Sequence, residues 1–289
     1  MHFLEVNNIS HNYSVTDKNT KPAINNISFS LEKGEILGII GHTGSGKSTL
    51  VSHLNGLLKP DCGEILLDGV NIWENPKEIS KVRARVGLVF QYPEYQLFEE
   101  TVYKDIAFGP KNIGLSDEEI DRRIRKSAKL LGFGEELFDK SPFDLSGGQK
   151  RRVAIAGVVS MEPELIVFDE PTAGLDPVGR QAIFKAIKDY RANNKASVII
   201  VSHSMEDMAL ICDKILVLNK GSVFDFGTTK DIFSKSEDLK KIGLNVPIIT
   251  EVFLQLKNKY NISSDVITTV EEAEDFLLSF LKERGVSVD

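Results

Sequence analysis

The chain of 289 residues carries a formal net charge of −7, with 42% hydrophobic and 27% charged residues. This composition is typical of a soluble globular protein, and its negative charge provides no global field that would attract nucleic acid. No apolar run reaches eighteen residues, and the N-terminus lacks a basic region followed by an apolar one. We therefore expect neither a membrane span nor a secretory signal. Cys62 and Cys212 lie far apart without CxxC spacing, which favours a reducing cytosol in which both thiols are buried.

The first 35 residues predict antiparallel strands. Residues 3–6 and 27–31 alternate between apolar and polar side chains, as expected for strands with one buried face. A polar loop over residues 16–22 separates them. This region therefore predicts a small antiparallel β subdomain at the start of the chain.

The most informative stretch of the sequence is GHTGSGKST, which follows an apolar run, Ile36–Ile40, and precedes a helical pattern that begins at Leu50. Strand, glycine-rich turn and helix form the context of a phosphate-binding P-loop. The glycines let backbone N–H groups surround an anion, and the helix N-terminus adds further N–H groups. Lys47 can reach the β- and γ-phosphates of a nucleotide, and the Ser48 hydroxyl can ligate Mg²⁺. The predicted nucleotide-binding residues of this loop are Gly41, His42, Thr43, Gly44, Ser45, Gly46, Lys47, Ser48 and Thr49.

The middle of the chain changes character after a buried strand at residues 86–90. Over residues 92–159 the recognisable pieces are helical, with helices at 101–108 and 116–131. The second helix opens with a serine–glutamate capping box, and we interpret its basic side chains as a solvated face. Because this block separates two buried strands, it predicts a helical subdomain inserted into an α/β core.

The rest of the chain returns to strands and then ends in helices. Apolar strands at 165–169, 197–201 and 214–218 alternate with helices, which predicts a mainly parallel sheet with helices on both faces. We therefore predict an α/β fold with a P-loop NTPase core over residues 1–235. A helical extension follows over 236–289. In its last helix an apolar stripe indicates burial, against the chain's own core or against a partner: Val270, Ala273, Leu277, Phe280 and Leu281.

Four polar residues stand where predicted strands end. Asp169 and Glu170 follow one apolar strand, Gln91 follows another, and His203 follows a third. Ligands of open parallel sheets bind at the carboxyl ends of the strands. Asp169 is placed to hold Mg²⁺, and Glu170 to act as the general base or to orient the attacking water. Gln91 can contact the metal and the water, and His203 can hydrogen-bond the γ-phosphate.

A second glycine-rich helix start lies at LSGGQ, residues 145–149. Ser146 is placed to cap a helix that begins with two glycines, which makes this end a second anion site. One chain cannot easily bring this end onto its own P-loop, whereas two chains arranged head to tail can do so twice. The basic run that follows, 150–152, then has a structural explanation, and nucleic-acid binding through it is the less favoured alternative.

Together these motifs resemble the nucleotide-binding subunit of ATP-binding cassette (ABC) transporters over residues 1 to about 235. The resemblance implies that Tyr13 stacks on adenine, the alternative being an ordinary core or surface aromatic. It implies an inter-subunit contact at Asp176. It also implies that Gln91 is a sensor and metal contact, Asp169 a metal ligand, Glu170 the base and His203 the γ-phosphate sensor. Ser146, Gly148 and Gln149 would complete the ATP site of a partner chain.

Residues 90–112 and 141–157 are more finely similar to the ATPases of energy-coupling factor transporters, which take up vitamins and transition-metal ions. Within that group they resemble the second, or A-prime, ATPase. The resemblance implies ATP and Mg²⁺ as cofactors and a second ATPase chain, related or identical, as partner. It also implies a transmembrane coupling subunit at residues 91–100, an indirect substrate-binding membrane subunit, and a peripheral position on the cytoplasmic face of the cell membrane. The alternative is a soluble ATPase of the same fold that acts on nucleic acid or ribosomes.

Overall fold

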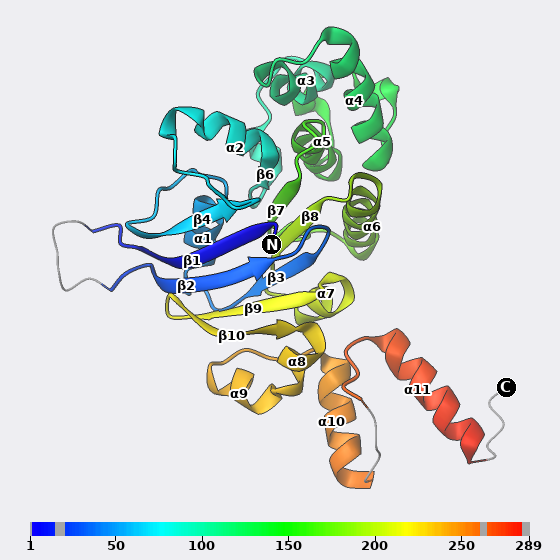
Figure 1. The fold of residues 1–289 in the computed structure, drawn as a ribbon. Helices are drawn as coiled ribbons and strands as arrows, with labels where there is room; N and C mark the ends of the chain where they lie inside the picture. Colours follow the sequence, from blue (N-terminus) through cyan, green and yellow to red (C-terminus); the bar gives the residue numbers. More distant parts are fainter. Residues whose placement is uncertain (1, 15–20, 261–264, 285–289) are drawn as a thin grey trace.

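The computed structural model describes residues 2–14, 21–260 and 265–284, and its centre is a six-stranded sheet (Figure 1). The strand order is β10-β9-β3-β8-β7-β6. The four strands β3, β8, β7 and β6 are parallel neighbours, β9 is parallel to β3, and β10 closes the sheet in the antiparallel direction. The mainly parallel sheet predicted from the apolar runs is confirmed. Its strands are β3 (Ile36–Ile40), β6 (Val86–Val89), β7 (Leu165–Asp169), β8 (Ser197–Val201), β9 (Lys214–Asn219) and β10 (Ser222–Thr228).

A second sheet of four antiparallel strands contains the N-terminal strands. Its order is β2-β1-β4-β5, and Leu4 of β1 stands opposite Leu31 of β2 and Leu67 of β4. The bounds are β1 (Leu4–His11), β2 (Ile24–Leu31), β4 (Cys62–Leu67) and β5 (Val70–Asn71). The expected antiparallel strands are thus confirmed, whereas most of the predicted polar loop, residues 16–20, lies outside the described residues. The prediction for the thiols is half wrong, because Cys62 is exposed at the start of β4 while Cys212 is buried.

Alternate residues of the central strands face two separate cores, as the two-residue period of a strand requires. Ile166 and Phe168 of β7 point into a core shared with the helices on one face. Leu165 and Val167 point into a second core, shared with α1 and the four-stranded sheet. Apolar side chains on both faces explain why the strands read as continuous apolar runs rather than alternating ones.

Seven helices of the described residues accompany the sheets before the C-terminal part. In Figure 1, α3, α4 and α5 gather at one end of the molecule, between β6 and β7 in the chain. Four short 3₁₀ segments lie before α2, before α3 and, twice, between α4 and α5, at 76–78, 93–96, 135–137 and 142–144. The helices are α1 (Lys47–Leu54), α2 (Ile79–Arg85), α3 (Val102–Asn112), α4 (Asp117–Leu130), α5 (Gly147–Val159), α6 (Pro177–Asn194) and α7 (Met205–Ile211).

Helix α3 runs four residues beyond the end predicted from the sequence. It passes through Gly109 and Pro110, which normally stop a helix because proline cannot donate an N–H to the carbonyl four residues earlier. That carbonyl belongs to Ile106, and it accepts a hydrogen bond from the Ser160 hydroxyl at 3.2 Å instead. A side chain from the end of α5 therefore replaces the missing backbone bond and allows α3 to continue.

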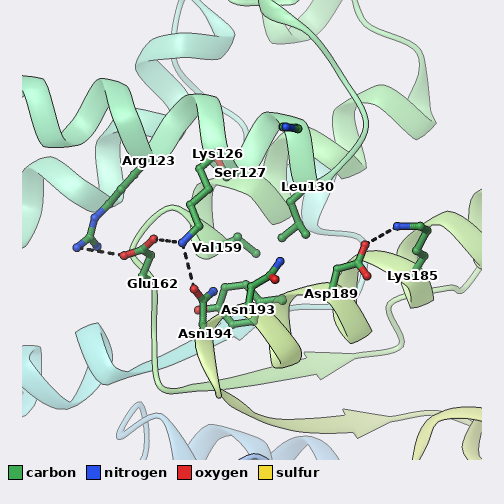
Figure 2. Close-up of a pocket in the computed structure, with 12 residues that line it drawn as sticks. Arg123, Lys126, Ser127, Leu130, Val159, Glu162, Lys185, Asp189, Asn193 and Asn194 are labelled. Carbon is green, nitrogen blue, oxygen red and sulfur yellow. Dashed lines mark hydrogen bonds and ion pairs between the residues drawn. The ribbon is translucent and has the colours of Figure 1, made fainter.

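Helix α4 has the predicted serine cap but not the reciprocal half of the capping box. The Glu119 N–H donates to Ser116, while the Glu119 carboxylate accepts bonds from Arg122 and Arg123. The basic face is largely exposed, as expected, at Arg122, Arg125 and Lys126, whereas the Arg123 side chain is only 16% exposed. A cleft of about 390 Å³ lies between α4 and α6, and Lys126 meets Glu162 there at 2.6 Å (Figure 2).

The C-terminal part contains α8 (Thr229–Ser234), α9 (Ser236–Lys241), α10 (Ile248–Tyr260) and α11 (Val270–Glu283). In Figure 1, α10 and α11 lie at the opposite end of the molecule from α3–α5. They share a small core that includes Phe253 and Ala273. The predicted apolar stripe is only partly buried, because Val270 is 66% exposed and Leu277 40%.

No helix within the described residues is both long enough and apolar enough to span a membrane.

Candidate nucleotide site

The order of the central strands brings the predicted site residues to one edge of the sheet. Because β3, β8, β7 and β6 are parallel neighbours, their carboxyl ends lie side by side. The P-loop follows β3, His203 follows β8, Glu170 follows β7 and Gln91 follows β6. The structure therefore brings together four motifs that are spread from Gly41 to His203 in the sequence.

The P-loop is closed by its own lysine. Lys47 is 7% exposed, and its ammonium donates to the carbonyl oxygens of Gly41 at 2.6 Å and His42 at 2.9 Å. Burial lowers the pKa of Lys47, while the nearby charges of Glu170 and Asp169 oppose that shift. The lysine is thus a buried cation held on carbonyl oxygens at the start of α1, beside two carboxylates.

Glycine is required at Gly46, where the loop turns into α1. The backbone there is left-handed, with φ of +103°, and a Cβ would lie 2.7 Å from the Ala23 carbonyl oxygen. No side chain caps the helix that follows. At Gly44, by contrast, a Cβ would meet nothing within 4 Å, so this part of the loop borders open space. The Ser45 hydroxyl is buried without a hydrogen-bond partner.

Glu170 is held in an uncommon backbone conformation immediately after β7. Its φ is +51°, and its N–H donates to the Val201 carbonyl oxygen of β8 at 2.9 Å. Burial, followed by the charge of Asp169, raises the pKa of Glu170 to about 7. Its Oε1 is buried without a hydrogen bond and lies 3.4 Å from the imidazole of His203. A carboxyl group with such a pKa is suited to accept a proton near neutral pH.

Burial also shifts the pKa values of two neighbours of Glu170, Asp169 and His203. Desolvation raises the pKa of Asp169, against the opposing effect of Lys47. Desolvation, with the positive charge of Lys47 and the proximity of His42, lowers the pKa of His203. His203 is therefore neutral at physiological pH, and a neutral imidazole can both donate and accept a hydrogen bond.

The remaining predicted residues border the same loop. The hydroxyl of Tyr13, a residue that is 64% exposed, lies 3.3 Å from the Thr49 hydroxyl. Ser48 is exposed in the first turn of α1, and Gln91 is exposed beyond β6. The site thus combines an uncapped helix start, an unpartnered buried hydroxyl and an unpartnered carboxylate oxygen. These features fit a nucleotide whose phosphates and metal ion would supply the missing partners.

The second glycine-rich helix start is closed by its own side chains. The Gln149 N–H donates to Ser146 Oγ at 3.3 Å, and the Ser146 N–H donates to Gln149 Oε1 at 3.0 Å. The sequence indicates the serine cap but not this reciprocal bond. Gly147 and Gly148 are exposed, and a Cβ on either would meet nothing within 4 Å. The N–H groups free to meet a ligand are therefore those of the two glycines.

The loop after Glu170 is fastened by contacts of Thr172, Arg180 and Asp207, which sequence reasoning missed. The buried Asp207 of α7 accepts hydrogen bonds from Thr172 at 3.2 Å and from Arg180 at 2.6 Å. Arg180 also donates to Ser204, the residue after His203. Asp176 caps α6 through the Gly179 N–H at 2.7 Å. This network holds the loops that follow β7 and β8 in a fixed relation.

Arg151 is a second missed residue. It is 3% exposed and forms two hydrogen bonds with the Glu94 carboxylate, at 3.1 and 3.2 Å. It also donates to the Ala173 carbonyl oxygen and lies against the Tyr92 ring. A buried arginine is not available to nucleic acid. The sequence signal was the basic run itself, but only the fold shows that Arg151 joins three segments.

Comparison with known proteins identifies the class. Residues 24–173, more than half of the chain, match the family described as "ABC transporter". The chain belongs to this family and, within it, to the ATP-binding proteins of energy-coupling factor transporters; it is an ATPase with the P-loop α/β fold.

Individual relatives align with nearly the whole length of the chain. It is 50% identical to the energy-coupling factor transporter ATP-binding protein EcfA2 of Clostridium perfringens, over 96% of this chain and 98% of that protein. The same identity is found with EcfA2 of Clostridioides difficile, over 97% and 98%. The solved structure of cbiO1 from Clostridium perfringens, part of the ABC transporter complex cbiONQ, matches with a TM-score of 0.74 and 39% identity. That match covers 88% of this chain and 99% of cbiO1. These relatives support the transporter ATPase and not the nucleic-acid or ribosome alternative.

Proposed function

We propose that the chain binds ATP with Mg²⁺ at the P-loop edge of the sheet and hydrolyses it to drive uptake through a membrane partner. The observation that carries this proposal is the position of Glu170 at the end of β7, where its unpartnered Oε1 is buried 3.4 Å from His203. Its raised pKa is consistent with this role. In this role Glu170 accepts the proton of the attacking water. Lys47 moves from its carbonyl partners to the phosphates, and His203 hydrogen-bonds the γ-phosphate.

In this proposal Mg²⁺ binds only together with the nucleotide, because the phosphates supply part of its ligands. The part of the chain that the structure describes contains no group of three or more His, Cys, Asp or Glu side chains arranged to hold a metal. Mg²⁺ would neutralise charge on the β- and γ-phosphates, with protein ligands from Ser48, Asp169 and Gln91. Tyr13 then lies next to Thr49, where its exposed ring is accessible to the adenine.

The site is completed by a second ATPase chain, either a related chain or a second copy. Gly147 and Gly148 at the start of α5 support this arrangement, because both are exposed and a Cβ on either would meet no atom within 4 Å. A structural relative, the bacterial ABC transporter cassette MJ0796, is described as dimeric; it is 27% identical, with a TM-score of 0.70. Since Ser146 and Gln149 bond one another, the nucleotide must either open that capping box or bind through the glycines alone.

An apolar groove supports the membrane partner. It has a volume of about 540 Å³ and lies between α2, α3, α5 and the segment after β6. Phe98 and Phe108, 56% and 46% exposed, meet edge to face at its border with centroids 4.9 Å apart. Within the predicted contact region 91–100, residues 96–98 line the groove, whereas Tyr95 stands outside it at 85% exposure. An amphipathic helix of the partner fits such a groove.

Arg151 connects this groove to the catalytic loop. Glu94, two residues before the groove-lining Gln96, is bound to Arg151 of α5, which in turn holds Ala173 in the loop after Glu170. A displacement of the partner helix would thus be transmitted to the loop beside the general base. We extend the proposal to the cytoplasmic face of the cell membrane and to a cargo of vitamins or transition-metal ions. The substrate-binding membrane subunit is reached only indirectly.

The test uses the chain purified with its membrane partners. Glu170→Gln should retain nucleotide binding and lower the ATP turnover number at least about 100-fold, because the base is lost while the cradle remains. The matched control is Lys185→Gln. Lys185 is exposed on α6, where it pairs with Asp189, so its replacement should leave the turnover number unchanged. Normal turnover in Glu170→Gln would refute the base. ATPase activity that is stimulated by nucleic acid, without any membrane partner, would favour the alternative.

A further inference from the structure

The P-loop contacts the C-terminal part of the chain through His42. The Nε2 atom of His42 is hydrogen-bonded to the carbonyl oxygen of Ile242, a residue 200 positions later in the turn after α9. Because a carbonyl oxygen only accepts, Nε2 must carry the proton. An otherwise exposed side chain of the phosphate loop is thereby fixed to a distant segment.

The turn is shaped to receive the imidazole ring. Gly243 follows Ile242 and has a left-handed backbone, with φ of +73°. A Cβ at this position would lie 3.0 Å from Nε2 and 3.1 Å from Cε1 of His42. Glycine is therefore needed here for two separate reasons, the backbone conformation and the close approach of the ring.

The backbone of His42 holds Lys47, the lysine of the P-loop. Its carbonyl oxygen accepts the Lys47 ammonium at 2.9 Å and the Ser45 N–H at 3.0 Å. The residue whose side chain is fixed by the C-terminal turn is therefore also the residue whose carbonyl closes the P-loop. A shift of the turn would move this carbonyl, and with it the lysine that faces the phosphates.

The turn itself is fastened to α10. The Gly243 N–H donates to the Lys240 carbonyl oxygen at 2.8 Å, and the Lys240 ammonium reaches Glu251 of α10 at 2.7 Å. Leu244, the next residue, is buried in the large core beside the sheet. The contact with His42 thus belongs to a fixed turn that stands between the P-loop and the C-terminal helix pair.

We infer that His42 is a positioning residue through which the C-terminal extension sets the P-loop and thereby its affinity for a nucleoside triphosphate. When the phosphates attract Lys47, the His42 carbonyl loses one of its two donors, and the bond to Ile242 remains to hold the loop. The inference rests on the proposed ATPase function and adds regulation of that site by the helices α10 and α11.

The experiment compares matched variants of the full chain in its transporter complex. His42→Ala should raise both the KM for ATP and the Kd for a fluorescent ATP analogue at least about fivefold, a typical coupling between sites. His42→Gln, whose amide N–H can reach the same carbonyl, should restore most of the affinity.

Glycine variants separate the ring contact from backbone strain. Gly243→Ala should raise the KM for ATP, whereas Gly114→Ala, with φ of +79° and nothing within 4 Å of its Cβ, should not. In a chain that already carries His42→Ala, the effect of Gly243→Ala should largely disappear, because the ring is gone. An undiminished effect would overturn the inference, and so would wild-type ATP affinity in His42→Ala. An inactive wild-type complex would instead refute the proposed function itself.

Discussion

Both α1 and α5 begin at a glycine-rich turn, yet α1 has no side-chain cap whereas α5 is capped by Ser146 and Gln149. At α1 the turn is crowded: Gly46 has no room for a Cβ, and Lys47 is buried against carbonyl oxygens. At α5 the two leading glycines face open space. The comparison shows that the start of α1 leaves N–H groups for a ligand within a crowded loop of its own chain. The start of α5, by contrast, is capped by its own side chains and exposes its two glycines to solvent.

The largest expected effect concerns the cradle. Lys47→Met should weaken ATP binding about tenfold to hundredfold, because a charge-assisted bond to phosphate is lost. It also leaves the carbonyl oxygens of Gly41 and His42 without the ammonium. Isothermal titration with ATP measures the change. Unchanged affinity would mean that the uncapped start of α1 is not the phosphate site.

The next effect is on stability and depends on pH. The pKa of Glu170 is raised to about 7, so its ionised form is unfavourable in the folded chain and stability falls as pH rises from about 4.5 to 7. Glu170→Gln should therefore stabilise the nucleotide-free chain by up to about 3 kcal/mol at pH 8. The gain should shrink as the pH is lowered through 7 and vanish near pH 4.5.

Urea unfolding at several pH values measures this gain, and one that is independent of pH would contradict the electrostatic origin. The start of α5 has no such group, so Ser146→Ala should show no comparable pH dependence.

A smaller effect concerns the capped end. Ser146→Ala should cost about 1 kcal/mol of unfolding free energy through loss of the cap. In a mixed complex it should slow hydrolysis at the P-loop of the other chain. If only the mutated chain's own P-loop were affected, the head-to-tail arrangement would be wrong.

The smallest effect sharpens the comparison most. Gly148→Ala should raise the unfolding free energy by about 0.5–1 kcal/mol, because alanine is a better helix residue and its Cβ has free space. The same change should lower ATPase activity, because in the proposed dimer the added methyl group points toward the nucleotide of the other chain. Activity that rises together with stability would show that α5 does not contact nucleotide.

Much of this fold could be predicted because its strands are short apolar runs that end in polar residues. Each main element of the site can be recognised from its neighbours in sequence: the P-loop, Asp169, Glu170 and His203. The parallel order of the strands then brings these elements together. Helix α2 escaped prediction because its sequence ISKVRAR is short and mixes polar with apolar side chains. The end of α3 escaped because the partner of the Ile106 carbonyl, Ser160, lies 54 residues later.

The contacts of the site that escaped prediction are those made with distant parts of the chain. Arg151 looked like part of a basic run, and nothing local pairs it with Glu94, 57 residues earlier. His42 occupies a variable position within the P-loop pattern, and its bond to Ile242 spans 200 residues. Pattern reasoning finds residues whose chemistry is read from their neighbours in sequence, while residues that join segments become visible only when the chain is folded.

The ion pairs in the polar cleft of Figure 2 make the packing of α4 sensitive to ionic strength. Glu162, at a φ of +53°, receives Lys126 and Arg123 of α4, and Lys126 also reaches Asn194 at the end of α6. The helical block is thus attached to the rest of the chain partly by ion pairs at the surface, which salt screens; the Debye length falls from about 10 Å at 0.1 M to about 3 Å at 1 M. Concentrated salt would therefore loosen the ion-paired part of this attachment, so the mobility of α4 depends on the ionic strength as well as on the packing.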